Sequence, residues 1–183
     1  MLISIDAHIP FPRYIVYVTY RDNLTDLVPY MSKVRQIQFK SRQEQDGLLH
    51  LVHEWYGGAD VPALARAFLS EDLLNWTEES IWDNSEYTNT WQIKTHFFTE
   101  AVYCRGKNYF LEDDKGTVIQ SRGELIIDPQ QIKGTPQQLT VMIARIVENS
   151  LTKQITPNFQ QMSQGVCEYL NKSQAGEMSR NNY

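Results

Sequence analysis

Positive charge and cysteine are both scarce in this sequence, and their scarcity excludes several classes of protein. The 183 residues include 17 Lys and Arg against 22 Asp and Glu, a formal net charge of -5. An acidic surface repels phosphate, so nucleic acid and anionic membranes are not expected partners. The only cysteines are Cys104 and Cys167, and we expect both thiols to be reduced rather than bridged.

Long apolar runs are missing as well. No stretch approaches the ~18 apolar residues that a membrane helix requires, so no integral membrane segment is expected. The first residues, Met1 to Asp6, have no basic segment and soon reach a charge, unlike a secretory signal peptide. We therefore expect a cytoplasmic protein. The near-average hydrophobic content of 42% predicts one domain, residues 1–171, and the polar residues 172–183 predict a disordered tail.

Motifs for catalysis or metal binding are also absent from the sequence. It contains no G-x-S-x-G, no phosphate loop and no dinucleotide-binding fingerprint. His50 and His53 lie three residues apart on a predicted strand, so they point to opposite faces and cannot share a metal ion without a bulge. Cys104 beside Arg105 suggests an activated thiol, but a buried, inert cysteine is the preferred interpretation. We expect no metal, no cofactor and no catalytic residue.

A series of strand-like segments is present instead. Residues 2–9 alternate between apolar and polar, which predicts a strand with one buried face. Two short helices are predicted next, and residues 60–74 predict another short helix between strands. The remaining predicted strands are 33–42, 48–56, 76–83, 88–98, 101–112 and 117–127. Most of them are joined by turns, which predicts an antiparallel meander.

A long helix is predicted after the last strand. From Leu139 to Leu170, apolar residues recur mostly in steps of three or four, which is the helical period. Ile143 and Ile146 belong to the stripe that should face the sheet. Pro157 lies inside this run and lacks a backbone donor, which predicts a kink or a break.

This order of elements resembles the START-like and birch-pollen-allergen superfamily, also called SRPBCC or the polyketide cyclase and lipid transport superfamily. The resemblance rests on residues 9–17, on Leu27 to Met31, on Gly116-Thr117 and on the helix from Pro136. Residues 61–66 with 76–82 are similar to an uncharacterised bacterial branch. The resemblance implies an α+β helix-grip fold, in which a curved antiparallel sheet of about seven strands surrounds the long C-terminal helix. Two short helices follow the first strand, and a cavity lies between sheet and long helix.

Aromatic residues on the predicted strands are candidate walls of that cavity. Strand 48–56 and strand 88–98 each place aromatic side chains and one polar group, His53 or Thr95, on one face. The polar group would orient a ligand, while the alternative is a filled core. The candidate ligand-binding residues are His53, Trp55, Trp82, Trp91, Ile93, Thr95, Phe97, Ile143 and Ile146.

The placement of Glu78 depends on the register of strand 76–83. If Trp76 and Trp82 face inward, Glu78 does too, and burial would raise its pKa enough for acid or base chemistry. The other register leaves Glu78 in water. The cost of burying an unpaired charge favours the solvated placement.

Three functions stay open on this evidence. The leading prediction is binding or transport of a hydrophobic small molecule, lipid-like or polycyclic, in the cavity. The alternatives are a cyclase or aromatase-type enzyme, for which only His53 and Glu78 supply ionisable groups, and a protein-interaction module with a filled core. Residues 60–74, with Leu64 and Phe68 on their apolar face, are predicted to form either a lid over the cavity mouth or a fixed plug.

Overall fold

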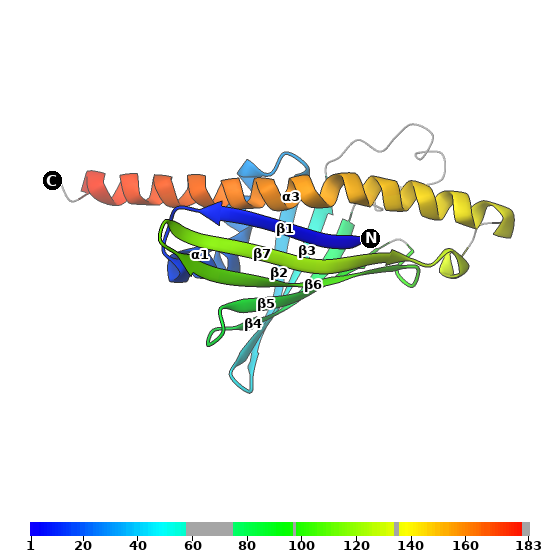
Figure 1. Cartoon of the computed structure of the whole chain (residues 1–183), viewed down its shortest axis with the longest axis horizontal. Helices are drawn as coiled ribbons and strands as arrows, with labels where there is room; N and C mark the ends of the chain where they lie inside the picture. Colours follow the sequence, from blue (N-terminus) through cyan, green and yellow to red (C-terminus); the bar gives the residue numbers. More distant parts are fainter. Residues whose placement is uncertain (58–74, 97, 134–135, 181–183) are drawn as a thin grey trace.

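Seven antiparallel strands form one sheet in the computed structural model, which describes residues 1–57, 75–96, 98–133 and 136–180 (Figure 1). The spatial order is β1-β7-β6-β5-β4-β3-β2, so within the described chain β1 is the strand that pairs with a partner distant in sequence. The strands are β1 (Leu2–Ile9), β2 (Val34–Gln45), β3 (Leu48–Gly57), β4 (Asn75–Asp83), β5 (Thr88–Thr95), β6 (Val102–Asp113) and β7 (Gly116–Ile127). The helices are α1 (Arg13–Asp22), the 3₁₀ helices η1 (Leu24–Tyr30) and η3 (Pro129–Gln131), and α3 (Gln137–Arg180).

Two of the turns need residues in the left-handed backbone region. Asp46 and Gly47 join β2 to β3 with φ angles of 53° and 78°, which is the combination that a two-residue hairpin turn favours. Gly116 begins β7 with a φ of 142°, and a Cβ atom there would lie 2.3 Å from the carbonyl oxygen of Ile9. Glycine therefore allows β7 to start against the end of β1.

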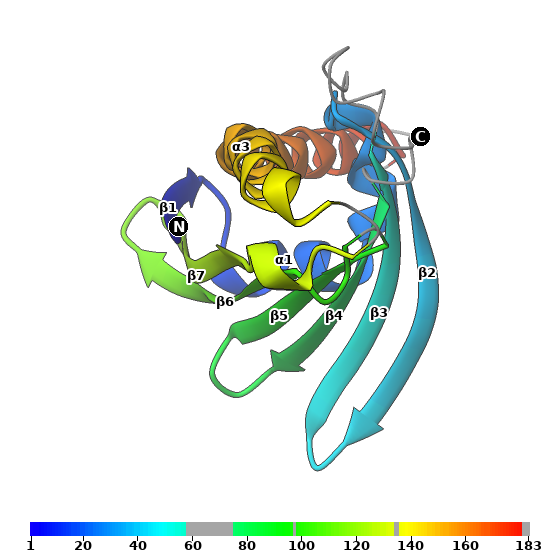
Figure 2. The same cartoon turned by 90° about the vertical axis from the view of Figure 1, so that its right-hand side faces the viewer.

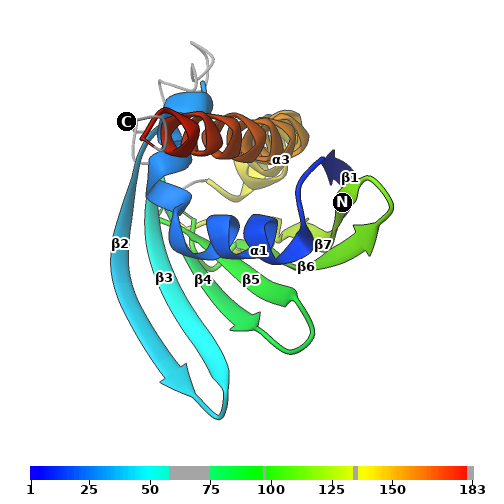
Figure 3. The same cartoon turned by 90° about the vertical axis from the view of Figure 1, so that its left-hand side faces the viewer.

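The sheet curves around α3, which lies along its concave side, while α1 and η1 cover one end (Figures 2 and 3). Two groups of buried residues connect α3 to the rest of the protein. The first, here the α1 core, includes Val16, Tyr17 and Leu27, together with Val166 and Leu170 of α3.

The second group, here the η3 core, lies at the other end of the sheet. It includes Val102, Leu125 and Ile132, together with Ile143 and Val147 of α3. The helix is thus attached to the sheet near both ends of its packed length. This arrangement confirms the predicted fold class.

Several local predictions differ from the structure. The segment predicted as a second short helix is the 3₁₀ helix η1, and β5 ends at Thr95 rather than at residue 98. Of the kink or break predicted at Pro157, the break is wrong, because α3 is continuous through this residue. Ile155 and Phe159, on either side of this proline, both pack against the η3 core, and this packing holds the flanking turns in place.

Two further predictions concern the C-terminal end of α3 and the segment between β3 and β4. The helix α3 runs to Arg180, past residue 171, where the ordered domain was predicted to end; the domain boundaries themselves stay a prediction. Residues 60–74, with Leu64 and Phe68, lie outside the described residues.

The attachment of α3 can be tested at Ile143, which is 7% exposed in the η3 core. Ile143→Asp should prevent folding, because an unpaired buried carboxylate costs more than the few kcal/mol of net stability that a domain has. Its neighbour Met142 is 48% exposed, so Met142→Asp is the matched control and should melt close to the wild type. Thermal melting followed by circular dichroism distinguishes the two, and a normal melt for Ile143→Asp would contradict the docking of α3.

Candidate ligand-binding site

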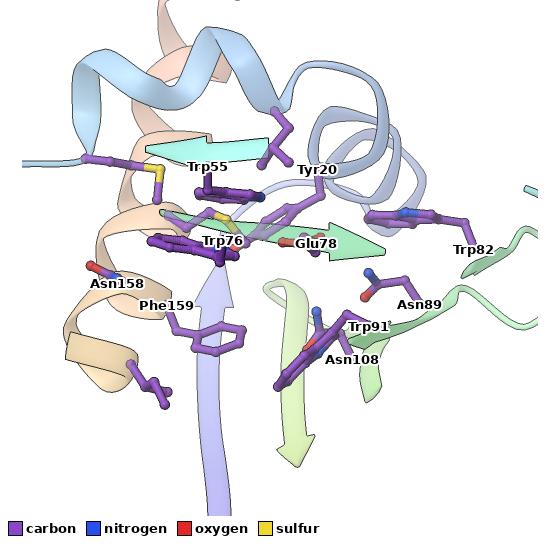
Figure 4. A pocket seen from close by; sticks show the side chains of 14 residues that line it. Tyr20, Trp55, Trp76, Glu78, Trp82, Asn89, Trp91, Asn108, Asn158 and Phe159 are labelled. Atoms are coloured by element: carbon purple, nitrogen blue, oxygen red, sulfur yellow. The ribbon is translucent and has the colours of Figure 1, made fainter. Parts of the chain in front are cut away.

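A cavity of about 100 Å³ lies between the concave face of the sheet and the middle of α3 (Figure 4). Aromatic side chains from α1, β3, β4, β5 and α3 form most of its wall: Tyr20, Trp55, Trp76, Trp82, Trp91 and Phe159. Aliphatic and thioether side chains complete the apolar part: Leu24, Met31, Ile155 and Met162. The polar part consists of Glu78, Asn89, Asn108 and Asn158.

Two indole rings are stacked along one wall of the cavity. Trp55 of β3 and Trp76 of β4 are directly paired across the two strands. Their ring centroids are 5.4 Å apart and their planes differ by 16°. Across the cavity, Trp91 of β5 contacts Phe159 of α3 at 6.0 Å between centroids. Flat aromatic faces therefore border the space from both the sheet and the helix.

Trp91 is held in place by a pair of glycines. Gly106 of β6 lies directly beside it in the sheet and pairs with Gly123 of β7. A Cβ atom on Gly106 would lie 2.4 Å from the Trp91 ring, and one on Gly123 would lie 3.1 Å from it. The ring thus occupies the space that two side chains would fill, and its Nε1 donates a hydrogen bond to Asn108 at 3.2 Å. The sequence analysis did not recognise this role for the glycines.

Glu78 is half-buried and faces the cavity rather than the outer surface of the sheet, so the expectation that it lies in water is wrong. The register places Glu78 on the same face of β4 as the buried Ser80 and Trp82. Burial alone raises the pKa of the Glu78 carboxyl from 4.5 to about 7. In the described part of the chain, neither a hydrogen bond nor an ion pair compensates this carboxyl. The adjacent Glu79, in contrast, forms an ion pair with Lys94.

Further polar atoms around the cavity lack a partner in the described structure. The side-chain oxygens of Asn89 and Asn158 and the Nε1 atom of Trp55 are buried without a hydrogen bond. Asn89 is 3% exposed and Trp55 is 5% exposed, so solvent does not satisfy them. By contrast, the hydroxyl of Tyr20 is hydrogen-bonded to Ser163 at 2.9 Å. Buried polar groups without partners are uncommon and indicate either bound water or a ligand.

The structure brings only part of the predicted site together. Trp55, Trp82 and Trp91 line the cavity. Ile93 is half-buried next to the η3 core, and Ile143 belongs to that core, more than two helical turns before the cavity-lining residues of α3. Three more predicted residues lie elsewhere: Thr95 is buried but does not line the cavity, Ile146 is half-buried, and Phe97 lies outside the described residues.

His53 is close to the cavity without lining it. It lies directly opposite Glu78 in the β3–β4 pair and packs edge-on against Phe39 of β2, with 5.8 Å between ring centroids. Burial lowers the pKa of its imidazole, which favours the neutral ring, and its Nδ1 has no partner in the described structure.

The other titratable candidate, Cys104, is not arranged for reactivity. Its thiol is buried in the η3 core, and burial raises its pKa to about 12. A thiol with a raised pKa is a poor nucleophile because the thiolate is the reactive form.

Among the described residues, no group of three or more His, Cys, Asp or Glu side chains gathers where it could hold a metal ion. No described helix is long and apolar enough to cross a membrane.

Comparisons with known proteins support the fold. No family model matches the chain and no curated protein matches it. Among solved structures, a protein from Thermus thermophilus matches with a TM-score of 0.65 and 16% identity, covering 92% of this chain and 99% of that one. The Zhui aromatase/cyclase from a Streptomyces species matches with a TM-score of 0.64 and 9% identity, covering 91% and 93%. Ara h 8.0201 matches with a TM-score of 0.55 and 13% identity, covering 92% and 98%.

At these identities the likeness shows the fold and does not transfer an activity. The chain has the seven-stranded sheet and long C-terminal helix of the Bet v 1-like, helix-grip structures. The resemblance that the order of elements predicted is therefore confirmed at the level of fold.

The packing of the Trp91 ring against the two glycines can be tested by substituting Gly106. Gly106→Ala should destabilise the protein by roughly 1–3 kcal/mol, because the new methyl group overlaps the indole ring and must displace it. The same Cβ would lie 2.5 Å from the carbonyl oxygen of Arg122, so the backbone offers no relief. Chemical denaturation measures the loss, and an unchanged midpoint would show that Trp91 is not seated on the glycines.

The buried carboxyl of Glu78 makes stability depend on pH. Its pKa is about 7 in the folded protein against an ordinary 4.5, so the native state binds this proton more tightly than the unfolded chain. The group therefore lowers the free energy of unfolding progressively as pH rises from about 4.5 to about 7, with the full loss above that range. Glu78→Gln should be more stable than the wild type at about pH 8, and this gain should shrink towards pH 4.

The control for this prediction is Glu79→Gln, which makes the same chemical change on the neighbouring residue. Because Glu79 is paired with Lys94, its replacement should not produce a gain that grows with pH. Urea denaturation of the three proteins at the two pH values provides the comparison. Equal pH dependence in wild type and Glu78→Gln would rule out a buried Glu78.

Proposed function

We propose that this protein binds a hydrophobic small molecule in the cavity between the sheet and α3. The observation that supports this most directly is the aromatic wall, in which side chains from three neighbouring strands and two helices face one space of about 100 Å³. Ligand sites in proteins are typically concave, mostly apolar and equipped with a few polar groups that orient the ligand. The cavity has this composition.

The size and shape of the cavity favour ring-containing ligands over long acyl chains. A cavity of about 150 Å³ is known to accept benzene, so a cavity of about 100 Å³ suits a small ring-containing molecule only if the surrounding side chains move slightly to admit it. The stacked pair of Trp55 and Trp76 and the ring of Trp91 offer flat faces, on which another ring can stack.

A cyclase-type enzyme is the second candidate, and Glu78 favours it. A carboxyl group with a pKa of about 7 is matched to general acid or base catalysis at neutral pH. The Streptomyces structure with the same fold is an aromatase/cyclase. One such carboxyl group in an aromatic cavity is compatible with proton transfer to a bound aromatic molecule. Ligand binding alone requires no catalytic group, so we place the binding function before the enzymatic one.

The binding proposal can be tested with naphthalene, a small, neutral and fluorescent aromatic probe. The probe should bind the native protein, and Met162→Trp, which fills the cavity from α3, should weaken binding by about tenfold or more, the effect of losing one well-packed ring contact. Met142→Trp is the matched control, because Met142 lies on the exposed side of the same helix. Probe binding that appears only under partly denaturing conditions, or that Met162→Trp leaves unchanged, would count against the cavity.

A further inference from the structure

The described lining of the cavity carries negative charge without positive charge. Of the fourteen residues that line it, Glu78 is the only acidic one and none is Lys, Arg or His. A ligand with a carboxylate or phosphate would find no cation there and would be repelled by ionised Glu78. Fatty acids and other acidic lipids are therefore poorly suited to this cavity.

The polar atoms without partners are mostly hydrogen-bond acceptors. The carboxyl of Glu78 is unpaired, and the side-chain oxygens of Asn89 and Asn158 have no donor within the described residues. Among the buried lining atoms that lack a partner in the described structure, Trp55 Nε1 is the one donor. A ligand that satisfies this set must chiefly donate hydrogen bonds, and an ammonium group is a donor with no acceptor.

The surroundings of Glu78 are also suited to a cation. On β4 it lies between the inward-facing Trp76 and the inward-facing Ser80, and on β5 it lies diagonally across from Trp91. Figure 4 shows Glu78 and Asn89 pointing into the space that the indole rings border. The faces of indole rings attract cations, so charge on the ligand would be stabilised by the rings as well as by the carboxylate.

We infer that the ligand of this cavity is a small arylalkyl amine, bound as its ammonium cation with the nitrogen at Glu78 and Asn89 and the ring against Trp55, Trp76 and Trp91. This inference rests on the proposed function and specifies its ligand class. A neutral hydrocarbon would leave Glu78 and Asn89 unpaired, and an acid would add a second negative charge beside Glu78. The amine pairs the buried carboxylate and occupies the aromatic space.

The test uses isothermal titration calorimetry to compare three ligands of similar size that differ in charge. These are 2-phenylethylamine, 2-phenylethanol and 3-phenylpropionate, which are respectively a cation, a neutral molecule and an anion at neutral pH. The amine should bind about tenfold or more tightly than the alcohol, as expected for a charge-assisted hydrogen bond against a neutral one. The acid should bind more weakly than the alcohol.

The variants identify the group responsible for this preference. Glu78→Gln should abolish the advantage of the amine, so that the amine and the alcohol bind this variant with similar affinity. Glu79→Gln, whose parent residue is paired with Lys94, should behave like the wild type with all three ligands. Because glutamine retains the size of glutamate and removes a buried charge, Glu78→Gln is expected to fold.

The pH dependence of the wild type provides a second test that needs no variant. The amine requires ionised Glu78, so its affinity should rise with pH and level off above about 7, where the carboxyl is ionised without ligand. An alkylammonium keeps its proton throughout this range. His53, the titratable group that faces Glu78 from β3, has its pKa lowered by burial, so its imidazole is neutral near pH 7. Binding near neutral pH should therefore release protons from the protein, which titrations in buffers of different ionisation enthalpy measure.

The outcomes separate this inference from the proposed function. If the amine binds no more tightly than the alcohol, or does not bind, the inference is overturned, while binding of the alcohol and of naphthalene would leave the proposed function intact. If the amine preference persists in Glu78→Gln, the cation lies elsewhere and the inference is also overturned. If none of these compounds, charged or neutral, binds at the cavity, the proposed function itself fails.

Discussion

The attachment of α3 to the sheet near both ends of its packed length is the constraint on which the cavity depends. Ile143 and Val147 secure the helix to the η3 core, and Val166 and Leu170 secure it to the α1 core. The helix residues that line the cavity, Ile155, Asn158, Phe159 and Met162, all lie between these two attachments. Between these attachments the helix contributes half-buried side chains, and the space left there is bordered by large rings.

Glu78 is the point at which stability and binding oppose each other. A buried, unpaired carboxyl costs folding free energy, and the neighbouring strand positions show that apolar or small polar side chains fit the same face of the sheet. Residues that reduce stability without a structural benefit tend to be retained for function. The same reasoning applies to Asn89, whose side-chain oxygen is buried without a partner in the described structure.

Periodicity was sufficient to predict the strands and the long helix, because alternation and helical spacing are local properties of the sequence. Alternation also placed Trp55 and Trp91 on the inner face. The preference for a solvated Glu78 was wrong because it rested on the cost of burying a charge, whereas the buried Ser80 and Trp82 occupy the same face of β4. The cavity-facing part of α3 could not be predicted, since the helical stripe does not reveal which turns contact the sheet. The seat of Trp91 on Gly106 and Gly123 depends on the pairing of three strands, which no local pattern encodes.

The pairing of β1 with β7 has a consequence for the order in which the protein folds. Leu2 pairs with Glu124 and Ile9 with Thr117, so this closure joins segments separated by most of the chain, whereas the other strand pairs join neighbours in sequence. Bringing distant segments together has a large entropic cost that must be met before their contacts form, and such contacts slow folding. The hairpins can therefore assemble before β1 pairs with β7, and the packing of α3 against β1 follows that closure. Since α3 forms one wall of the cavity, the cavity is completed only when α3 has packed against the sheet. A ligand can therefore accelerate only the folding steps in which its binding surface is already formed.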